Sequence, residues 1–168
     1  YNDKEVKKVF CVPGNAGTQD FAKNIDIDIL DFASILDLIN KEKIDLTIVG
    51  PEGPLAEGMV DYLKSNNARV FGPDKYSSNL EGSKIFARDI MDEYSIPQPK
   101  YKKCSSAKEV LEVKNEWGLP LVIKADGLAA GKGVIICDTD FLFEDALEVM
   151  FESKQFGSAS NIVSVEEC

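Results

Sequence analysis

The residues best suited to bind a ligand lie in one short stretch, the sequence VIKADGLAAGKGV at 122–134. Lys124 ends an apolar run, and a loop with three glycines and a second lysine follows. These loop residues are Gly127, Gly131, Lys132 and Gly133. Glycine lets a backbone approach an anion closely and take a positive φ, so such a loop can offer several N–H groups to one phosphate. The two lysines add charge-assisted donors. The stretch therefore predicts a binding site for a nucleotide polyphosphate.

The glycine spacing excludes two common nucleotide loops. A Walker A loop needs G-x-x-x-x-G-K-[ST], whereas here Gly131 follows Gly127 too closely and no hydroxyl residue follows Lys132. The dinucleotide fingerprint G-x-G-x-x-G is absent from the stretch, and a strand-like run at 134–137 stands where that motif has a helix. Strand, glycine loop and strand predict a hairpin flap that can fold over phosphates. An ordinary glycine-rich β-hairpin is the alternative.

Composition and charge limit the classes of partner. The chain has 168 residues, of which 44% are hydrophobic and 29% charged, values that are typical of a globular protein. A net charge of −10 argues against a nucleic-acid-binding surface, which usually carries a basic patch. No stretch approaches the ~20 apolar residues of a membrane span, and the polar start lacks an apolar signal region. We expect no nucleic-acid or membrane partner and a cytoplasmic location.

The chain contains four cysteines and no histidine. The cysteines are widely separated and form no C-x-x-C pair; they are Cys11, Cys104, Cys137 and Cys168. We therefore expect neither a zinc site nor a Cys–His nucleophile pair. The spacing favours buried free thiols in a reducing compartment.

Strand-like and helix-like runs alternate along the chain, which predicts an α/β fold. In the first half we expect strands at 6–12, 44–49 and 69–71, with helical spacing at 35–39 and 55–63 between them. This order predicts a doubly wound parallel sheet with binding sites at the carboxyl ends of its strands.

The second half begins with an expected helix at 83–94, whose cap is Ser83 and whose apolar face carries Phe86, Ile90, Met91 and Tyr94. Two prolines then mark a boundary at 95–101. A short strand, a helix ending at Trp117-Gly118, the flap hairpin, a helix with a core stripe at 143–151 and a strand at 162–167 follow. We expect a first domain at 1–80, a connecting helix and linker at 81–100, and a small α+β subdomain at 101–168.

Two loops at expected strand ends hold further candidates. The loop at 12–18 offers backbone amides, an amide side chain and a hydroxyl, a set that suits a phosphorylated sugar. Its residues of interest are Gly14, Asn15, Gly17 and Thr18. In the loop at 49–55, Glu52 lies beside Pro51 in a stiff turn and can hold a sugar hydroxyl or an ammonium group. Each loop taken alone is also compatible with ordinary turn chemistry.

Charged residues at two element ends complete the candidates. Lys84 stands at an expected helix start, where the helix dipole and the ammonium would attract an anion. A solvated surface lysine is the alternative. Glu166 and Glu167 end the last apolar strand and can accept hydrogen bonds from an adenine amino group or a ribose, or form an exposed end.

Several motifs follow one another in the order seen in the phosphoribosylamine–glycine ligases of the ATP-grasp superfamily. These are PGNAGT, IDLTIVGPEGPL, FGP, LEGSK, VIKADGLAAGKGV, and QFG before VEE. The chain resembles this family over nearly all of its length. The resemblance implies an incomplete doubly wound domain followed by a small ATP-grasp subdomain. It also implies an ATP-dependent ligation in purine biosynthesis: glycine becomes a glycyl phosphate, and 5-phosphoribosylamine attacks it to give glycinamide ribonucleotide, ADP and phosphate. Mg²⁺, or Mn²⁺ in its place, would accompany ATP.

The same resemblance implies roles for particular residues. Lys84, Lys124 and the loop from Gly127 to Gly133 would bind the phosphates of ATP. The adenine would meet a hinge segment, partly through backbone groups; the segment is Glu166, Glu167 and Cys168. The pocket edge for phosphoribosylamine would consist of Gly14, Asn15, Gly17, Thr18, Pro51 and Glu52. The resemblance gives no role to Asp126.

The chain departs from the family pattern at both ends. It lacks the family's opening G-x-G-G-R-E-H loop and the later segment with the magnesium ligands, so we expect no complete catalytic set and no metal ligands within it. We expect this piece by itself to be inactive. Two alternatives stay open: another ATP-grasp enzyme, such as a carboxylase acting on a purine intermediate or on biotin, and a non-catalytic nucleotide-binding module. The two substrate loops favour the glycine ligase.

Overall fold

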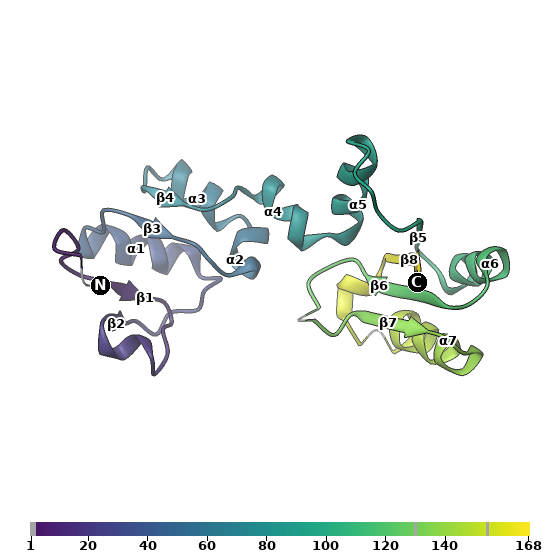
Figure 1. Cartoon of the computed structure of the whole chain (residues 1–168). Helices are drawn as coiled ribbons and strands as arrows, with labels where there is room; N and C mark the ends of the chain where they lie inside the picture. The colour runs from purple at the N-terminus through teal and green to yellow at the C-terminus, as the bar shows by residue number, and fades with distance from the viewer. Residues whose placement is uncertain (1–2, 130, 154) are drawn as a thin grey trace. The chain divides into compact units, whose positions relative to one another are not determined.

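The structure is a computed structural model that describes residues 3–129, 131–153 and 155–168 (Figure 1). The chain divides into two compact units, one reaching to Tyr76 and the other spanning Ser77–Cys168. Each unit has its own hydrophobic core. The domain limits expected from the sequence stay a prediction.

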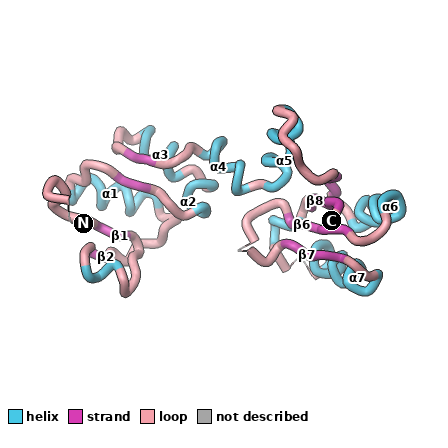
Figure 2. The backbone as a smooth tube through the Cα atoms, viewed as in Figure 1, coloured by secondary structure: helices cyan, strands magenta, loops and turns pink. Residues whose placement is uncertain are grey.

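The first unit alternates short strands with helices, as the sequence predicts (Figure 2). Its elements are β1 (Phe10–Cys11), a 3-10 turn (Thr18–Asp20), β2 (Lys23–Asn24), α1 (Phe32–Glu42), β3 (Thr47–Ile48), α2 (Glu52–Ala56), α3 (Met59–Ser65), β4 (Val70–Phe71) and the start of α4 (Lys75–Gly82). Strand β1 pairs with β2, and β3 pairs with β4, both in parallel. The α/β class with parallel strands is therefore confirmed. Within the described ranges, however, the strands form two separate pairs and not one sheet.

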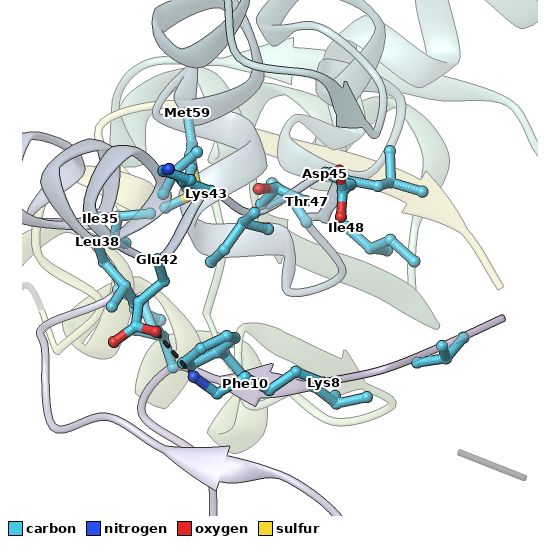
Figure 3. A pocket seen from close by; sticks show the side chains of 18 of the residues that line it. Lys8, Phe10, Ile35, Leu38, Glu42, Lys43, Asp45, Thr47, Ile48 and Met59 are labelled. Carbon is cyan, nitrogen blue, oxygen red and sulfur yellow. Dashed lines mark hydrogen bonds and ion pairs between the residues drawn. The ribbon is translucent and has the colours of Figure 1, made fainter. Parts of the chain in front are cut away.

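A cavity of about 900 Å³ lies along β1 and β3 (Figure 3). Phe10, Thr47 and Ile48 are among the residues that line it. Both strands border this cavity on an edge without a ladder partner among the described residues. Because a strand extends only as far as its ladder, the observed strands are shorter than the predicted runs at 6–12 and 44–49.

One face of β3 is covered and the other is bare. Val49 packs into the core of the first unit with residues of α1 and α3, including Ile35 and Leu63. Ile48 and Leu46 point the other way and are 70% and 52% exposed. Parallel sheets normally have helices packed on both faces, whereas in this unit only one face of β3 is packed.

Two helices differ from the sequence-based expectation. The run 55–63 predicted one helix, but Gly58 takes a left-handed conformation (φ +90°) and separates α2 from α3. Helix α4 was not predicted, because its sequence KYSSNLEG has no apolar face. Helix α1 follows the expected pattern: Ser34 N donates to the cap residue Asp31 at 3.0 Å, and Ile35 and Ile39 are buried.

The second unit contains one continuous four-stranded antiparallel sheet in the order β5-β8-β6-β7. Its elements are α5 (Lys84–Glu93), β5 (Tyr101–Cys104), α6 (Ala107–Trp117), β6 (Leu121–Ala125), β7 (Val134–Cys137), α7 (Asp140–Leu147), a π-helical turn (Glu148–Glu152), a 3-10 turn (Gly157–Ser160) and β8 (Val163–Glu167). The predicted strands, helices and hairpin of this half are all present.

Alternation along β6 and β8 gives the sheet two different faces. On the core face, Ile123 and Val165 pack with the buried residues of α6 and α7. The predicted stripe of 143–151 belongs to this core: Phe143 and Met150 are fully buried. The opposite face carries Lys124, Ser164 and Glu166, and it meets α5.

Helix α5 begins where the sequence predicts but buries a different residue. Phe86 N donates to Ser83 Oγ at 3.0 Å, which confirms Ser83 as the cap. Ile85 is the buried residue of the helix, whereas Tyr94 of the predicted apolar face is 67% exposed. The helix packs on the polar face of the sheet, where Arg88 donates to Glu166.

All four cysteines are free thiols, but they are not all buried. Cys104 and Cys137 are buried, and burial raises the pKa of each thiol to about 11. Cys11 is half-buried, and Cys168, at the end of β8, is exposed, so the expectation of burial is wrong there. Among the described residues, no helix is both long and apolar enough to cross a membrane.

Candidate nucleotide site

The predicted flap is the connection between β6 and β7. Lys124 pairs with Val134 at the mouth of this hairpin, and Ala125 N donates to Gly133 O at 2.8 Å. The prediction of a strand, a glycine loop and a second strand is therefore confirmed. Lys132 N closes the loop by donating to Ala129 O at 2.9 Å, and its side chain is exposed.

The loop needs its glycines for steric reasons. A Cβ on Gly127 would lie 2.9 Å from Cβ of Ala159, and one on Gly133 would lie 2.6 Å from Cβ of Ala129. Gly131 has φ +76°, a conformation that side chains disfavour. The backbone can therefore fold tightly beside the segment that contains Ala159.

Asp126, whose role the sequence leaves open, joins the flap to the start of α5. Its Oδ1 accepts hydrogen bonds from Ile85 N at 2.8 Å and from Ser83 Oγ at 2.9 Å, and its backbone oxygen accepts one from Lys84 N at 3.1 Å. The carboxylate thus satisfies donors at a helix start, where negative charge is favourable. Asp126 fixes Lys84 at the root of the flap.

Lys84 lies beside the flap and close to a second cation. Its Nζ donates to Gly127 O at 3.1 Å. Burial lowers the pKa of Lys84, and the nearby ammonium of Lys124 lowers it further, although Asp126 and Glu166 act in the opposite direction. An anion bound between the two ammonium groups would relieve this repulsion. Lys84 is part-buried against the flap, so the alternative of a solvated surface lysine is wrong.

A buried carboxylate holds the second lysine. Lys124 Nζ donates to Glu166 Oε2 at 2.6 Å. Arg88 of α5 donates to both oxygens of Glu166, through Nε to Oε1 at 3.2 Å and through a terminal nitrogen to Oε2. Ser164 Oγ donates to Oε1 at 3.0 Å. These four residues are called the Glu166 cluster below.

Electrostatics in the Glu166 cluster favour an ionised carboxylate. Burial acts to raise the pKa of Glu166, but the hydrogen bonds from Lys124 and Arg88 outweigh it and hold the pKa below its ordinary value. Two cations face one carboxylate, so the cluster keeps an excess of positive charge in a chain whose net charge is −10. Sequence reasoning missed Arg88; its spacing of four residues from Lys84, on one helix face, is the signal that was available.

The hinge segment offers a ligand less side-chain chemistry than the sequence suggests. The carboxylate of Glu166 is only 2% exposed and occupied by the cluster. Glu167 Oε1 accepts a hydrogen bond from Lys100 N at 2.9 Å, and Cys168 is exposed. Beside the flap, a hollow of about 560 Å³ is lined by Leu128, Ala129, Lys132, Gln155 and Phe156.

The predicted sugar-phosphate loop of the first unit is a self-contained turn. Asn15 N donates to Thr18 Oγ1 at 2.8 Å, and Thr18 N donates to Asn15 Oδ1 at 3.1 Å. Asn24, which sequence reasoning missed, accepts from Thr18 Oγ1 at 2.7 Å and donates to Asn15 O at 2.8 Å. Gly14 has φ +81°, and a Cβ there would lie 2.2 Å from Asn24 Oδ1. Gly17 precedes the 3-10 turn.

The second predicted substrate loop leads into α2. Glu52 is its first residue and is exposed, and Pro51 precedes it. Pro51 and Val12 both line the 900 Å³ cavity of the first unit, so the loops that follow β1 and β3 border one hollow. The four predicted site residues of the 12–18 loop are not among the residues that line this cavity; they are Gly14, Asn15, Gly17 and Thr18.

Known proteins resemble the chain over both units. Residues 1–81 match the family described as phosphoribosylglycinamide synthetase, N domain, and residues 82–168 match its ATP-grasp (A) domain. The phosphoribosylamine–glycine ligases of Caldanaerobacter subterraneus subsp. tengcongensis and of Escherichia coli K12 are 41% and 43% identical to it. The alignments cover 96% of this chain but only 39% and 38% of those proteins, so the chain spans well under half of their length.

Solved structures are also similar to the chain over most of its length. The phosphoribosylamine–glycine ligase of Thermotoga maritima matches 96% of this chain and 38% of its own, with 26% identity and a TM-score of 0.68. The biotin carboxylase domain of the Hydrogenobacter thermophilus 2-oxoglutarate carboxylase, at 19% identity and a TM-score of 0.72, shares the fold over 88% of this chain. The two family matches adjoin at residue 82 and together cover the whole sequence. The chain belongs to the phosphoribosylglycinamide synthetase family.

Proposed function

We propose that this chain is the part of a phosphoribosylamine–glycine ligase that binds ATP and borders the phosphoribosylamine site. One observation carries the proposal: two lysines lie at the root of a glycine-rich flap, where Lys84 Nζ donates to Gly127 O at 3.1 Å and Lys124 stands at the mouth of the hairpin. Each ammonium has used only one of its three N–H donors in the hydrogen bonds described, so both retain donors for an anion. The family membership of both units supports the choice of this reaction.

The donor set fits a nucleotide polyphosphate. Two ammonium groups and the backbone of a glycine loop match the charge and the many oxygens of a phosphate chain. The hollow beside Lys132 and Phe156 gives room next to the flap. For the adenine, the partners would be backbone groups of the exposed segment 167–168 other than Glu167 N, which donates to Lys100 O at 3.0 Å.

A structural neighbour of this chain, the Hydrogenobacter thermophilus carboxylase domain, is described in complex with MgADP. In the ranges that the structure describes, no group of three or more Cys, Asp or Glu side chains is placed to hold a metal.

The proposed chemistry requires positioning and charge neutralisation. ATP supplies the phosphoryl group that converts the carboxylate of glycine into an acyl phosphate; the amine of phosphoribosylamine then attacks the carbonyl carbon and phosphate leaves. Lys84 and Lys124 neutralise charge that gathers on phosphate oxygens, and the flap excludes water from them. None of these roles needs a side-chain nucleophile.

Two experiments test the proposal. Isothermal titration of the chain with Mg-ATP is expected to show binding that Lys124→Met and Lys84→Met each weaken by about 1.5–3 kcal/mol, the value of a charge-assisted hydrogen bond. Lys108→Met is the matched control, because Lys108 is 85% exposed and lies on α6. Equal affinity in all four proteins would contradict the nucleotide site.

The second experiment tests the reaction. Residues 1–168 replace the aligned segment of the Escherichia coli relative, and phosphate release is measured with ATP, glycine and phosphoribosylamine. We expect release that needs all three substrates and that Lys124→Met abolishes nearly completely. A well-folded hybrid that binds Mg-ATP but releases no phosphate would favour a non-catalytic nucleotide-binding module.

A further inference from the structure

A buried carboxylate, that of Glu166, lies within the cationic site, although phosphate binding by itself does not require a carboxylate. A carboxylate near a phosphate repels it. Yet Glu166 is 2% exposed, whereas the side chains of Lys124 and Arg88 are 23% and 15% exposed. The anion therefore lies on the inside and the two cations lie nearer to solvent. This order places the positive groups between Glu166 and any ligand that arrives from outside.

We propose that Glu166 is a positioning residue that fixes the ammonium of Lys124 for a nucleotide polyphosphate, and that Arg88 neutralises the charge that Glu166 brings. This inference rests on the proposed function, in which Lys124 binds the phosphates. It gives Glu166 a role through Lys124 and not through the adenine.

The sheet register sets the position of Lys124. Lys124 stands opposite Ser164, and Glu166 is the diagonal neighbour on the same face, within reach of a long side chain. The bond of 2.6 Å from Lys124 Nζ to Glu166 Oε2 restricts a side chain that is otherwise mobile. Because the restriction exists before a ligand binds, less freedom is lost on binding. Two N–H groups of the ammonium stay available.

The geometry of Arg88 gives it a different task from Lys124. Its Nε and one terminal nitrogen donate to Glu166, and the other terminal nitrogen donates to Gln98 Oε1 at 3.3 Å. These donors point into the protein and not toward a ligand. Without Arg88, the pair of Lys124 and Glu166 would carry no net charge; with it, the cluster keeps one positive charge. Arg88 therefore allows Glu166 to hold Lys124 without cancelling its effect on phosphates.

A double-mutant cycle tests the proposal. Mg-ATP affinity is measured by isothermal titration for the chain, Glu166→Gln, Lys124→Met and the double variant. We expect Glu166→Gln to weaken binding by at least about tenfold, the effect of one charge-assisted bond. In the Lys124→Met background the same change should alter affinity less than about twofold, since coupled residues are not additive. Glu112→Gln, the same change at a residue of α6 whose side chain is 66% exposed, is the control and should stay within about twofold of the parent.

The outcomes separate the two claims. Unchanged or tighter binding by Glu166→Gln, or an equal loss in both backgrounds, would overturn the positioning role while a strong Lys124→Met effect keeps the nucleotide site. No effect of Lys124→Met would overturn both. If Glu166→Gln loses its cooperative melt, Arg88→Gln replaces it: we expect weakening of at least about threefold, restored only in part by Arg88→Lys, which keeps the charge but loses the bidentate contact. Unaltered affinity in Arg88→Gln would also reject the proposal.

Discussion

The two units use their strands in different ways. The second unit joins four strands into one antiparallel sheet, with a packed core on one face and the Glu166 cluster on the other. In the first unit, one strand of each parallel pair borders a cavity of about 900 Å³, and one face of β3 is bare. The proposed nucleotide site thus lies on a continuous sheet, whereas the predicted substrate loops follow strands of short pairs. We infer that the second unit is the more stable of the two.

Hydrogen exchange gives the largest expected contrast between the units. Amides in the central strands β6 and β8 are bonded on both sides, while β1 and β3 each have one partner among the described residues. We expect protection factors in β6 and β8 to exceed those in β1 and β3 by at least about a hundredfold, because local opening requires less free energy where fewer bonds break. Similar protection in both units would reject the comparison.

Removing Asp126 should destabilise the second unit strongly. In Asp126→Ala, Ile85 N and Ser83 Oγ lose an ionised acceptor, and we expect a loss of about 2–3 kcal/mol in the free energy of unfolding. The fluorescence of Trp117, the only tryptophan of the chain, reports this unit during a urea titration. Asp138→Ala, a change at an exposed aspartate, is the control and should have little effect.

Substitutions of two glycines test whether the predicted substrate loop of the first unit requires Gly14. Gly14→Ala places a Cβ against Asn24 at φ +81°, whereas nothing lies within 4 Å of a Cβ on Gly50. We expect Gly14→Ala to reduce stability by at least about 1–2 kcal/mol and Gly50→Ala to reduce it much less. Hydrogen exchange of β1 and β2 measures both. Equal effects would show that the Asn15–Thr18–Asn24 turn does not require Gly14.

Acid should destabilise the second unit through Glu166. The pKa of Glu166 is lower in the folded chain than its ordinary value of 4.5, so the folded state holds the proton less tightly than the unfolded state. The stabilisation is complete above about pH 4.5 and is lost as the pH falls through the folded pKa. The urea midpoint from Trp117 should therefore fall below that pH, with a shallower slope in Glu166→Gln. The same slope in both proteins would contradict the cluster.

An exposed ion pair in the first unit should have the smallest effect. Lys8 Nζ donates to Glu42 Oε2 at 2.9 Å, but the side chain of Lys8 is 57% exposed (Figure 3). We expect Lys8→Met to change the free energy of unfolding by less than about 1 kcal/mol, since solvent screens such pairs. Circular dichroism in urea measures the change. A loss comparable to that of Asp126→Ala would show that an exposed ion pair stabilises the chain as much as a part-buried carboxylate with its hydrogen bonds.

Local sequence signals account for most of the second unit. The cap at Ser83, the glycine loop after Lys124 and the strands of the flap all depend on neighbours in sequence, and all were predictable. In the first unit, Gly58 was a local signal for the break between α2 and α3, but it was not used to predict that break. The pairing of strands was not predictable in the first unit, because it depends on which edges find partners.

The partners of the site residues were harder to predict than the residues themselves. Arg88 and Glu166 lie 78 residues apart, and Ser83 and Asp126 lie 43 apart. No spacing rule connects such positions, so the sequence indicated Lys84 and Lys124 as ligands without showing what fixes them. Asn24 was missed for the same reason: only the parallel register of β1 and β2 brings it to the loop.

The thermal midpoint of the chain with and without millimolar Mg-ATP, with AMP as the control, tests the central claim most directly. A ligand that binds only the folded state raises stability by RT ln(1 + [L]/Kd). If Lys84, Lys124 and the flap form a polyphosphate site, Mg-ATP raises the midpoint well beyond AMP, and Lys124→Met removes most of that difference. A cooperative melt whose midpoint is the same with ATP, with AMP and without nucleotide would contradict the account.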